Sequence, residues 1–183
     1  MAVHRGKIAV AGDRCRFSID PHISGAGPSG DHPTVGDWLL IDRETQQPTR
    51  ILIRANLFKR RAPGVDRKEQ MIAANVDTVF IVASCNQDFS GSRLERYLVL
   101  AREVGVTPVV VLTKADITDT PETFEAAARD LQPGLVVRTV NGRDPGDVAR
   151  LASWCGMGKT VALLGSSGVG KSTLVNTLRG SDS

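Results

Sequence analysis

Short runs of alternating apolar and polar residues fill the N-terminal part of the chain. Alternation with a period of two is typical of half-buried β-strands, and turn residues such as Gly12-Asp13 and the Gly/Pro/Ser segment 25–33 separate the runs. The predicted strands are residues 7–11, 14–19, 37–41 and 50–54. Trp38 is expected to pack within the turn that enters the third strand. We predict a small β-barrel of the OB type over residues 1–66, followed by a linker that begins at Pro63-Gly64.

From Asp77 onward the pattern changes to nearly continuous apolar runs that alternate with segments of helical periodicity. The apolar runs are residues 78–83, 108–113, 135–140 and 160–164. Continuous apolar runs are typical of parallel strands, because helices cover both faces of a parallel sheet. The alternation of strands and helices therefore predicts an α/β domain with a parallel sheet over residues 67–183.

Each segment between these strands combines a helix start signal with an apolar stripe. The start signals are a capping box of Ser92 and Glu95, Thr120 before Pro121, and Asp144 before Pro145. The residues expected to face inward are Leu94, Tyr97, Leu98 and Ala101, then Phe124, Ala127, Ala128 and Leu131, then Val148, Leu151 and Ala152. A last helix with Leu174, Val175 and Leu178 on its inner face is predicted near the C-terminus.

Charge is informative only in its distribution. The chain carries 23 basic and 20 acidic residues, a net charge of +3 that does not by itself indicate an acidic partner. A basic stripe nevertheless runs from residue 50 to residue 68, where Asp66 is the one acidic residue before position 69 apart from none in strand 50–54. Its candidates for RNA contact are Arg50, Arg54, Lys59, Arg60 and Arg61, because OB barrels bind nucleic acid through such surfaces. A solvated charged edge is the open alternative, since few aromatic residues are available to stack on bases.

The cysteines and histidines indicate neither disulfides nor a metal site. Cys15, Cys85 and Cys155 are three in number and widely spaced, which favours a reducing cytoplasm. The three histidines have no Cys or carboxylate partners at ligand spacing. No apolar run approaches the length of a membrane span. We therefore expect a cytoplasmic monomer with no membrane partner.

Residues 165–172 match the complete phosphate-binding pattern G-x-x-x-x-G-K-[ST], directly after an apolar strand and directly before a helix. In such a loop glycines let successive backbone N–H groups converge on an anion at the N-terminus of the helix. The expected nucleotide-binding residues are Gly165, Ser166, Ser167, Gly168, Val169, Gly170, Lys171, Ser172 and Thr173. Lys171 is expected to reach the β- and γ-phosphates, and the Ser172 hydroxyl is expected to bind Mg²⁺.

The segment Thr113-Lys114-Ala115-Asp116 is similar to the base-reading pattern N-K-x-D. In that pattern the Asp carboxylate accepts hydrogen bonds from guanine N1–H and the 2-amino group, which adenine does not offer. Lys114 is expected to lie along the base and hold the phosphate loop. Thr113 keeps a hydroxyl but lacks the amide of Asn, which leaves the coupling between the two loops open. A polar turn that ends a strand is the alternative interpretation.

A third segment, Asn141-Gly142-Arg143, follows the strand at residues 135–140, where GTPases carry a Ser-Ala-Lys loop. In that loop a backbone N–H meets guanine O6. Asn141 and Gly142 are candidates for the same role, and an ordinary turn explains them equally well.

The order of these motifs is reversed relative to ordinary GTPases, because the base-reading tetrad precedes the phosphate loop. Together with Gly36-Asp37-Trp38, Ala74-Asn75-Val76-Asp77 and Leu94-Glu95-Arg96-Tyr97, the reversed order resembles the ribosome small-subunit-dependent GTPase A family over nearly the whole chain. The resemblance implies an OB domain, a circularly permuted GTPase domain and a C-terminal zinc-binding domain. It also implies GTP or GDP with Mg²⁺ as ligand and a role in late maturation of the small ribosomal subunit, with that subunit and its rRNA as partners.

Three departures from the family pattern are visible. Thr113 replaces Asn, Asn141-Gly142 replaces Ser-Ala, and no residues follow for the switch segments or the zinc cluster, which indicates a truncated chain without catalytic residues. The parent is thus expected to be a GTPase stimulated by the small subunit, and this chain to bind guanine nucleotide weakly without hydrolysing it. The alternatives are a non-catalytic rRNA-binding module whose nucleotide site is a scaffold, and an ATP-using P-loop kinase, which Asp116 disfavours.

Overall fold

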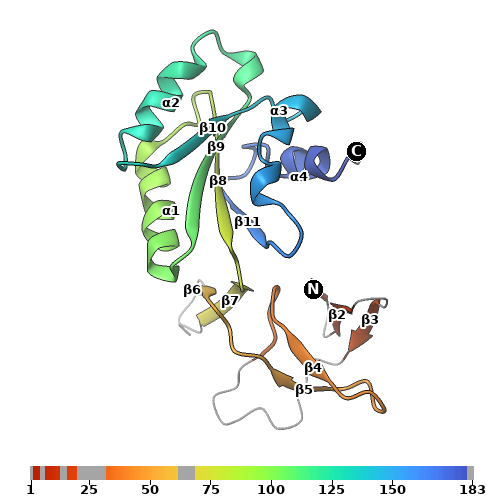
Figure 1. Cartoon of the computed structure of the whole chain (residues 1–183). Coiled ribbons are helices and arrows are strands. Elements are labelled where there is room, and N and C mark those ends of the chain that lie inside the picture. Colours follow the sequence, from red (N-terminus) through yellow and green to blue (C-terminus); the bar gives the residue numbers. More distant parts are fainter. Residues whose placement is uncertain (1, 5–6, 13–15, 20–31, 62–68, 181–183) are drawn as a thin grey trace. The chain divides into compact units, whose positions relative to one another are not determined.

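The computed structural model describes residues 2–4, 7–12, 16–19, 32–61 and 69–180 (Figure 1). The chain divides into two compact units, Met1–Val76 and Asp77–Ser183. The predicted boundary between residues 66 and 67 lies outside the described residues.

The first unit contains three small antiparallel sheets. The first holds β1 (Ala2–His4), β2 (Lys7–Ala11) and β3 (Arg16–Ile19), the second β4 (Leu39–Ile41) and β5 (Pro48–Ile51), and the third β6 (Leu57–Arg61) and β7 (Glu69–Ala74). The four predicted strands are all present, with shifted ends, whereas β6 and β7 were not predicted. No closed barrel is formed by the described part of this unit, so the OB barrel remains a prediction.

A turn at Gly36 joins the second and third of these sheets. Gly36 has φ +92, and a Cβ there would lie 2.0 Å from the carbonyl oxygen of Ala74, so only glycine fits. The side chain of Asn75 donates to the Gly36 carbonyl at 2.9 Å. Arg54 donates from two nitrogens to the Asp37 carboxylate, both at 2.7 Å. Parts of the Gly36-Asp37 and Ala-Asn-Val-Asp segments therefore hold this turn together.

Trp38 is a correction to the sequence-based expectation, because its side chain is 68% exposed. The inner side of the turn is filled by the Asp37–Arg54 ion pair and by the Ala74 backbone. The indole therefore does not pack within the turn.

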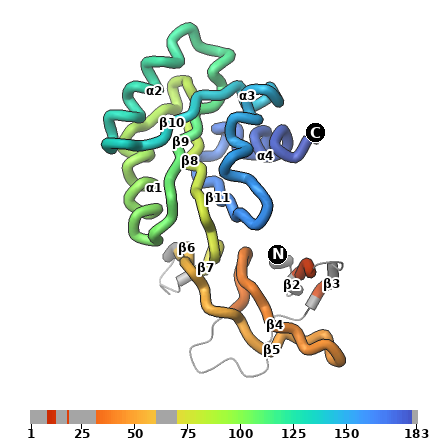
Figure 2. Tube along the Cα trace, in the orientation of Figure 1, coloured from red at the N-terminus to blue at the C-terminus, as the bar shows by residue number. Residues whose placement is uncertain are grey.

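The second unit is built on a parallel sheet in the order β10-β9-β8-β11. The strands are β8 (Thr78–Ser84), β9 (Thr107–Thr113), β10 (Val136–Thr139) and β11 (Val161–Leu164). Helices α1 (Gly91–Val104) and α2 (Pro121–Arg129) lie on one face, and α3 (Pro145–Ala149) and α4 (Lys171–Arg179) lie on the other (Figure 1). Figure 2 shows β11 beside β8, although more than seventy-five residues separate them in the chain, with Val161 opposite Thr78.

The central strands are buried on both sides, as their continuous apolar runs predict. All seven residues of β8 are buried. On the face of α3 and α4, Phe80, Leu151 and Leu174 belong to one apolar cluster with no exposed surface, and Phe80 meets Trp154 edge to face at 6.1 Å between ring centroids. This face of the sheet supports the loop that precedes α4, through buried Val169.

The helix ends confirm most of the start signals and correct two details. Asp144 caps α3 by accepting from the N–H groups of Gly146 and Asp147, as predicted. Helix α1 instead begins at Gly91 with Ser90 as N-cap, so the predicted capping box of Ser92 and Glu95 is wrong. Phe89 packs edge to face on Phe124 at 5.3 Å and fixes the entry of the chain into α1. Ala152 is exposed rather than inward, because α3 ends before it.

Candidate nucleotide site

The phosphate loop connects β11 to α4. Gly165 has φ +153, and a Cβ there would lie 2.4 Å from the carbonyl oxygen of Val82, so the loop passes the end of β8 at a distance that only glycine permits. Val169 in the middle of the loop is buried with 3% exposure. Gly170, with φ +91, is the N-cap of α4. A glycine-dependent approach followed by a helix N-terminus is the cradle that a phosphate group requires.

The ammonium group of Lys171 lies against the start of this loop. Its Nζ donates to the carbonyl oxygens of Gly165 at 2.8 Å and Ser166 at 2.6 Å. The Ser166 hydroxyl accepts from Nη1 of Arg93 in α1 at 2.6 Å. The sequence motif did not include Arg93, and nothing in the spacing of the chain points to it.

The base-reading tetrad begins at the end of β9, next to the phosphate loop. Thr113 is buried with 2% exposure, and its Oγ1 lies 2.6 Å from the carbonyl oxygen of Val169 and 3.2 Å from that of Ala83. The hydroxyl has one proton, and the shorter contact to Val169 is the stronger one. The coupling that the sequence left open is therefore made by the threonine hydroxyl itself.

The two ionisable residues of the tetrad follow a left-handed turn. Lys114 has φ 60 and ψ 32, which is uncommon for a residue with a Cβ, and it caps a short 3-10 helix over Ala115–Ile117. Asp116 is exposed within that helix. The turn therefore presents both side chains at the carboxyl end of the sheet.

The segment after β10 forms the third wall. The Asn141 N–H donates to Asp147 Oδ2 at 2.9 Å, and the Arg143 N–H donates to Asn141 Oδ1 at 3.0 Å. Thr177 Oγ1 of α4 donates to the Gly142 carbonyl at 2.7 Å. This segment is thus tied to the helix that begins at the phosphate loop.

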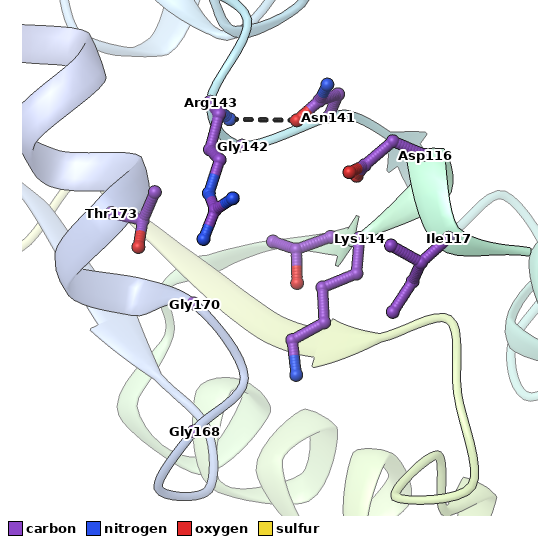
Figure 3. Close-up of a pocket in the computed structure, with 10 residues that line it drawn as sticks. Lys114, Asp116, Ile117, Asn141, Gly142, Arg143, Gly168, Gly170 and Thr173 are labelled. Carbon is purple, nitrogen blue, oxygen red and sulfur yellow. Dashed lines mark hydrogen bonds between the residues drawn. The ribbon is translucent and has the colours of Figure 1, made fainter.

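A cavity of about 370 Å³ lies between these three segments (Figure 3). The side chains of Lys114 and Asp116 project from one side, and that of Arg143 from the other. Its lining is Thr113, Lys114, Asp116, Ile117, Asn141, Gly142, Arg143, Gly168, Gly170 and Thr173. The structure thus brings the tetrad, the Asn141-Gly142 segment and part of the phosphate loop to one place, and it adds Ile117 and Arg143, which the motifs did not select.

The remaining members of the phosphate loop do not line this cavity. Ser167 and Ser172 are exposed, and Ser172 lies in the first turn of α4. Within the described residues no group of three or more His, Cys, Asp or Glu side chains could hold a metal ion. Ser172 therefore contributes a hydroxyl without a surrounding carboxylate cluster, which is suited to Mg²⁺ bound together with a nucleotide's own phosphates.

Cys85 directly follows β8, and its backbone N–H donates to the carbonyl oxygen of Thr113 at 2.9 Å. Burial, with a smaller contribution from the charge of Glu125, raises the pKa of its thiol to about 11. The thiol is therefore protonated at neutral pH and is a poor nucleophile.

The basic residues of the first unit are separate from this cavity in sequence and in fold. Arg50 and Lys59 are exposed, whereas Arg54 is bound to Asp37 as described above. Arg60 and Arg61 belong to β6, but their side chains lie outside the described part of the chain. Their contact with RNA remains a prediction.

None of the helices that the structure describes is long and apolar enough to cross a membrane.

Comparison with known proteins gives consistent matches over both units. The family model for RsgA GTPase matches residues 51–183. A small ribosomal subunit biogenesis GTPase RsgA of Mesorhizobium japonicum is 50% identical over 179 residues, which are 98% of this chain and 51% of that protein. A protein of Vibrio parahaemolyticus, small ribosomal subunit biogenesis GTPase RsgA 2, is 55% identical over 180 residues, 98% of this chain and 49% of its own length. The chain thus spans about half the length of these relatives.

Two solved structures share the fold. YjeQ from Thermotoga maritima matches with a TM-score of 0.72 and 23% identity, over 96% of this chain and 62% of that one. YloQ, described as a circularly permuted GTPase, matches with a TM-score of 0.68 and 26% identity, over 96% of this chain and 61% of its own. The order of motifs and the parallel four-stranded sheet agree with a partial permuted P-loop domain.

Proposed function

Because this chain belongs to the RsgA GTPase family, we propose that its second unit binds GDP or GTP with Mg²⁺. The observation that carries the proposal is the single cavity between the tetrad, the Asn141-Gly142 segment and the phosphate loop. We propose further that the whole parent protein is a cytoplasmic GTPase, stimulated by the small ribosomal subunit in its late maturation. A zinc-binding domain would belong to the part of the parent that this chain does not span.

The base would be read at the carboxyl end of the sheet. The Asp116 carboxylate offers two acceptor oxygens to guanine N1–H and the 2-amino group, and the stem of Lys114 offers an apolar surface to the ring. Because the Asn141 N–H is bound to Asp147, the Gly142 N–H is the better donor for guanine O6. Adenine lacks both the donors that Asp116 requires and the acceptor that this N–H requires.

The phosphates would be held by the backbone N–H groups of residues 165–172 and by Lys171. Mg²⁺ would neutralise part of the phosphate charge, and Ser172 would supply one oxygen ligand. Thr113 supports both parts, since it belongs to the tetrad and holds the carbonyl of Val169. Base and phosphates are therefore recognised by segments that are fixed to each other.

We predict that this chain binds GDP but does not turn over GTP. In the family's order of motifs, the switch segments follow the helix after the phosphate loop, in the half of the relatives that this chain does not span. Calorimetric titration of the chain with Mg²⁺-GDP should give saturable one-to-one binding with modest affinity. Phosphate release from GTP in the same sample should equal the spontaneous rate, with the full-length Vibrio parahaemolyticus relative as the active control. Steady turnover above the spontaneous rate would contradict this prediction.

We also propose that the first unit contacts rRNA. The observation that favours this role is the exposure of Trp38, 68%, which offers a ring for base stacking in a unit that also presents the exposed side chains of Arg50 and Lys59. Arg54 has a structural use in its ion pair with Asp37 and is the weakest of the RNA candidates.

Charge reversal tests this contact. Lys59→Glu, Arg60→Glu and Arg61→Glu together should reduce the affinity of the whole chain for small-subunit rRNA in a filter-binding assay by at least about tenfold, because three phosphate contacts would be lost. Asp42→Lys in the neighbouring sheet serves as a charge control. If the affinity stays the same, this part of the first unit has no role in RNA binding. If RNA binds tightly while GDP does not bind, the alternative of an RNA-binding module with a scaffold nucleotide site is favoured.

A further inference from the structure

Arg93 connects the first turn of α1 to the phosphate loop. Its Nη1 donates to Ser166 Oγ at 2.6 Å, across 73 residues of sequence, and the contact is partly buried. We propose that Arg93 is a second cation of the phosphate subsite and contacts the terminal phosphates of a bound guanine nucleotide. This inference rests on the proposed nucleotide-binding function.

The place of Arg93 in α1 does not favour a positive charge. The N-terminus of a helix carries the positive end of the helix dipole, so a cation in the first turn is unfavourable and an anion is favourable. The first turn of α1 contains no acidic residue. No carboxylate in the described part of the chain forms an ion pair with Arg93. The stability of α1 therefore does not account for an arginine at this position.

The contact with Ser166 places Arg93 at the terminal-phosphate end of the loop. The lysine of a phosphate loop reaches the β- and γ-phosphates, and Lys171 Nζ lies 2.6 Å from the carbonyl oxygen of Ser166. Arg93 and Lys171 thus approach the same residue, one at its hydroxyl and the other at its carbonyl. The cavity that holds the base-reading side chains is lined by Gly168, Gly170 and Thr173 but by neither Ser166 nor Arg93.

The chemistry of this pair is suited to a polyphosphate. Two cations lie at one loop residue, and their partners in the described structure are a neutral hydroxyl and two neutral carbonyls. A guanidinium has five N–H donors in a planar fork that matches phosphate oxygens, and hydrogen bonds to charged acceptors are stronger than those to a hydroxyl. The β- and γ-phosphates would therefore be better partners for Arg93 than Ser166 alone. This gives the residue a preference for nucleotides with more phosphates.

The test compares ligands of increasing phosphate number on the whole chain. Arg93→Gln should weaken binding of a non-hydrolysable GTP analogue by at least about tenfold, weaken GDP less, and leave GMP unchanged, each measured by fluorescence competition with Mg²⁺. Arg93→Lys should recover part of the loss because it restores the charge. Arg102→Ala is the matched control, since Arg102 lies on the same helix and its guanidinium contacts Gln132. It should bind all three ligands as the unaltered chain does.

Ser166→Ala separates a direct contact from support of the loop. It removes the hydroxyl but keeps the charge of Arg93, so its loss of GTP-analogue affinity should be clearly smaller than that of Arg93→Gln. An equal loss in the two variants, or a loss of GMP binding as large as that of the analogue, would overturn the proposal and make Arg93 a support for the loop. Unchanged analogue affinity in Arg93→Gln would also overturn it. If the unaltered chain binds none of the three nucleotides, the proposed function itself fails.

Discussion

Replacing Asp116 with Asn is expected to weaken GDP binding by at least about a hundredfold and to improve binding of xanthosine diphosphate. The Asn amide turns one acceptor into a donor, which then faces the N1–H and 2-amino donors of guanine. Xanthine has a carbonyl in place of the 2-amino group and accepts from the same amide. Because Asp116 is exposed and lines the cavity, the fold should not change.

The measurement is a competition titration of both diphosphates against a fluorescent guanine nucleotide, together with thermal unfolding to confirm the fold. Asp119→Asn is the matched control, since Asp119 is exposed two residues beyond the 3-10 helix and does not line the cavity. Equal GDP affinity in Asp116→Asn and in the unaltered chain would show that this carboxylate does not read the base.

Lys171→Ala is expected to weaken GDP and GTP-analogue binding by about a hundredfold, because charge-assisted hydrogen bonds to phosphate contribute about 1.5–3 kcal/mol each. The Nζ now donates to the carbonyls of Gly165 and Ser166 and would have to move by only a short rotation to reach the phosphates. Truncation removes this donor and leaves the two loop carbonyls to solvent. Lys171 is at the N-terminus of α4, where its loss should not weaken the helix.

The same titrations measure this effect, and Lys159→Ala provides the comparison. Lys159 forms its ion pair with Asp77 at 3.3 Å, away from the cavity lining. It should bind GDP like the unaltered chain. If Lys171→Ala kept its GDP affinity, the nucleotide would have to lie elsewhere than on the phosphate loop.

The sheet of the second unit could be predicted from the sequence because its strands are continuous apolar runs bounded by polar turns. β8 and β9 contain the most buried residues of the chain, and the period alone locates them. β6 and β7 could not be predicted in the same way. β6 begins with Leu57 and Phe58 but continues with three basic residues, so its strand character depends on pairing with β7 rather than on its own pattern. The helix start at Ser90 likewise depends on the packing of Phe89 against Phe124.

The site could be predicted as far as local motifs define it. The spacing of the phosphate loop and the tetrad identified the residues that line most of the cavity. The contacts that connect the motifs are long-range and leave no local signal. Thr113 bonds to Val169 across 56 residues, and Arg93 bonds to Ser166 across 73. Asp147 takes the Asn141 N–H because α3 begins beside that loop, which only the folded arrangement reveals.

The central claim is that this cavity selects guanine, and a direct comparison of GDP with ADP tests it. Both are titrated into the whole chain with Mg²⁺ against a fluorescent guanine nucleotide. The structure predicts that GDP competes and that ADP competes at least about a hundredfold more weakly, since Asp116 finds no donors on adenine. Equal affinities for GDP and ADP would contradict the assignment of Asp116 and would favour an ATP-using P-loop protein instead.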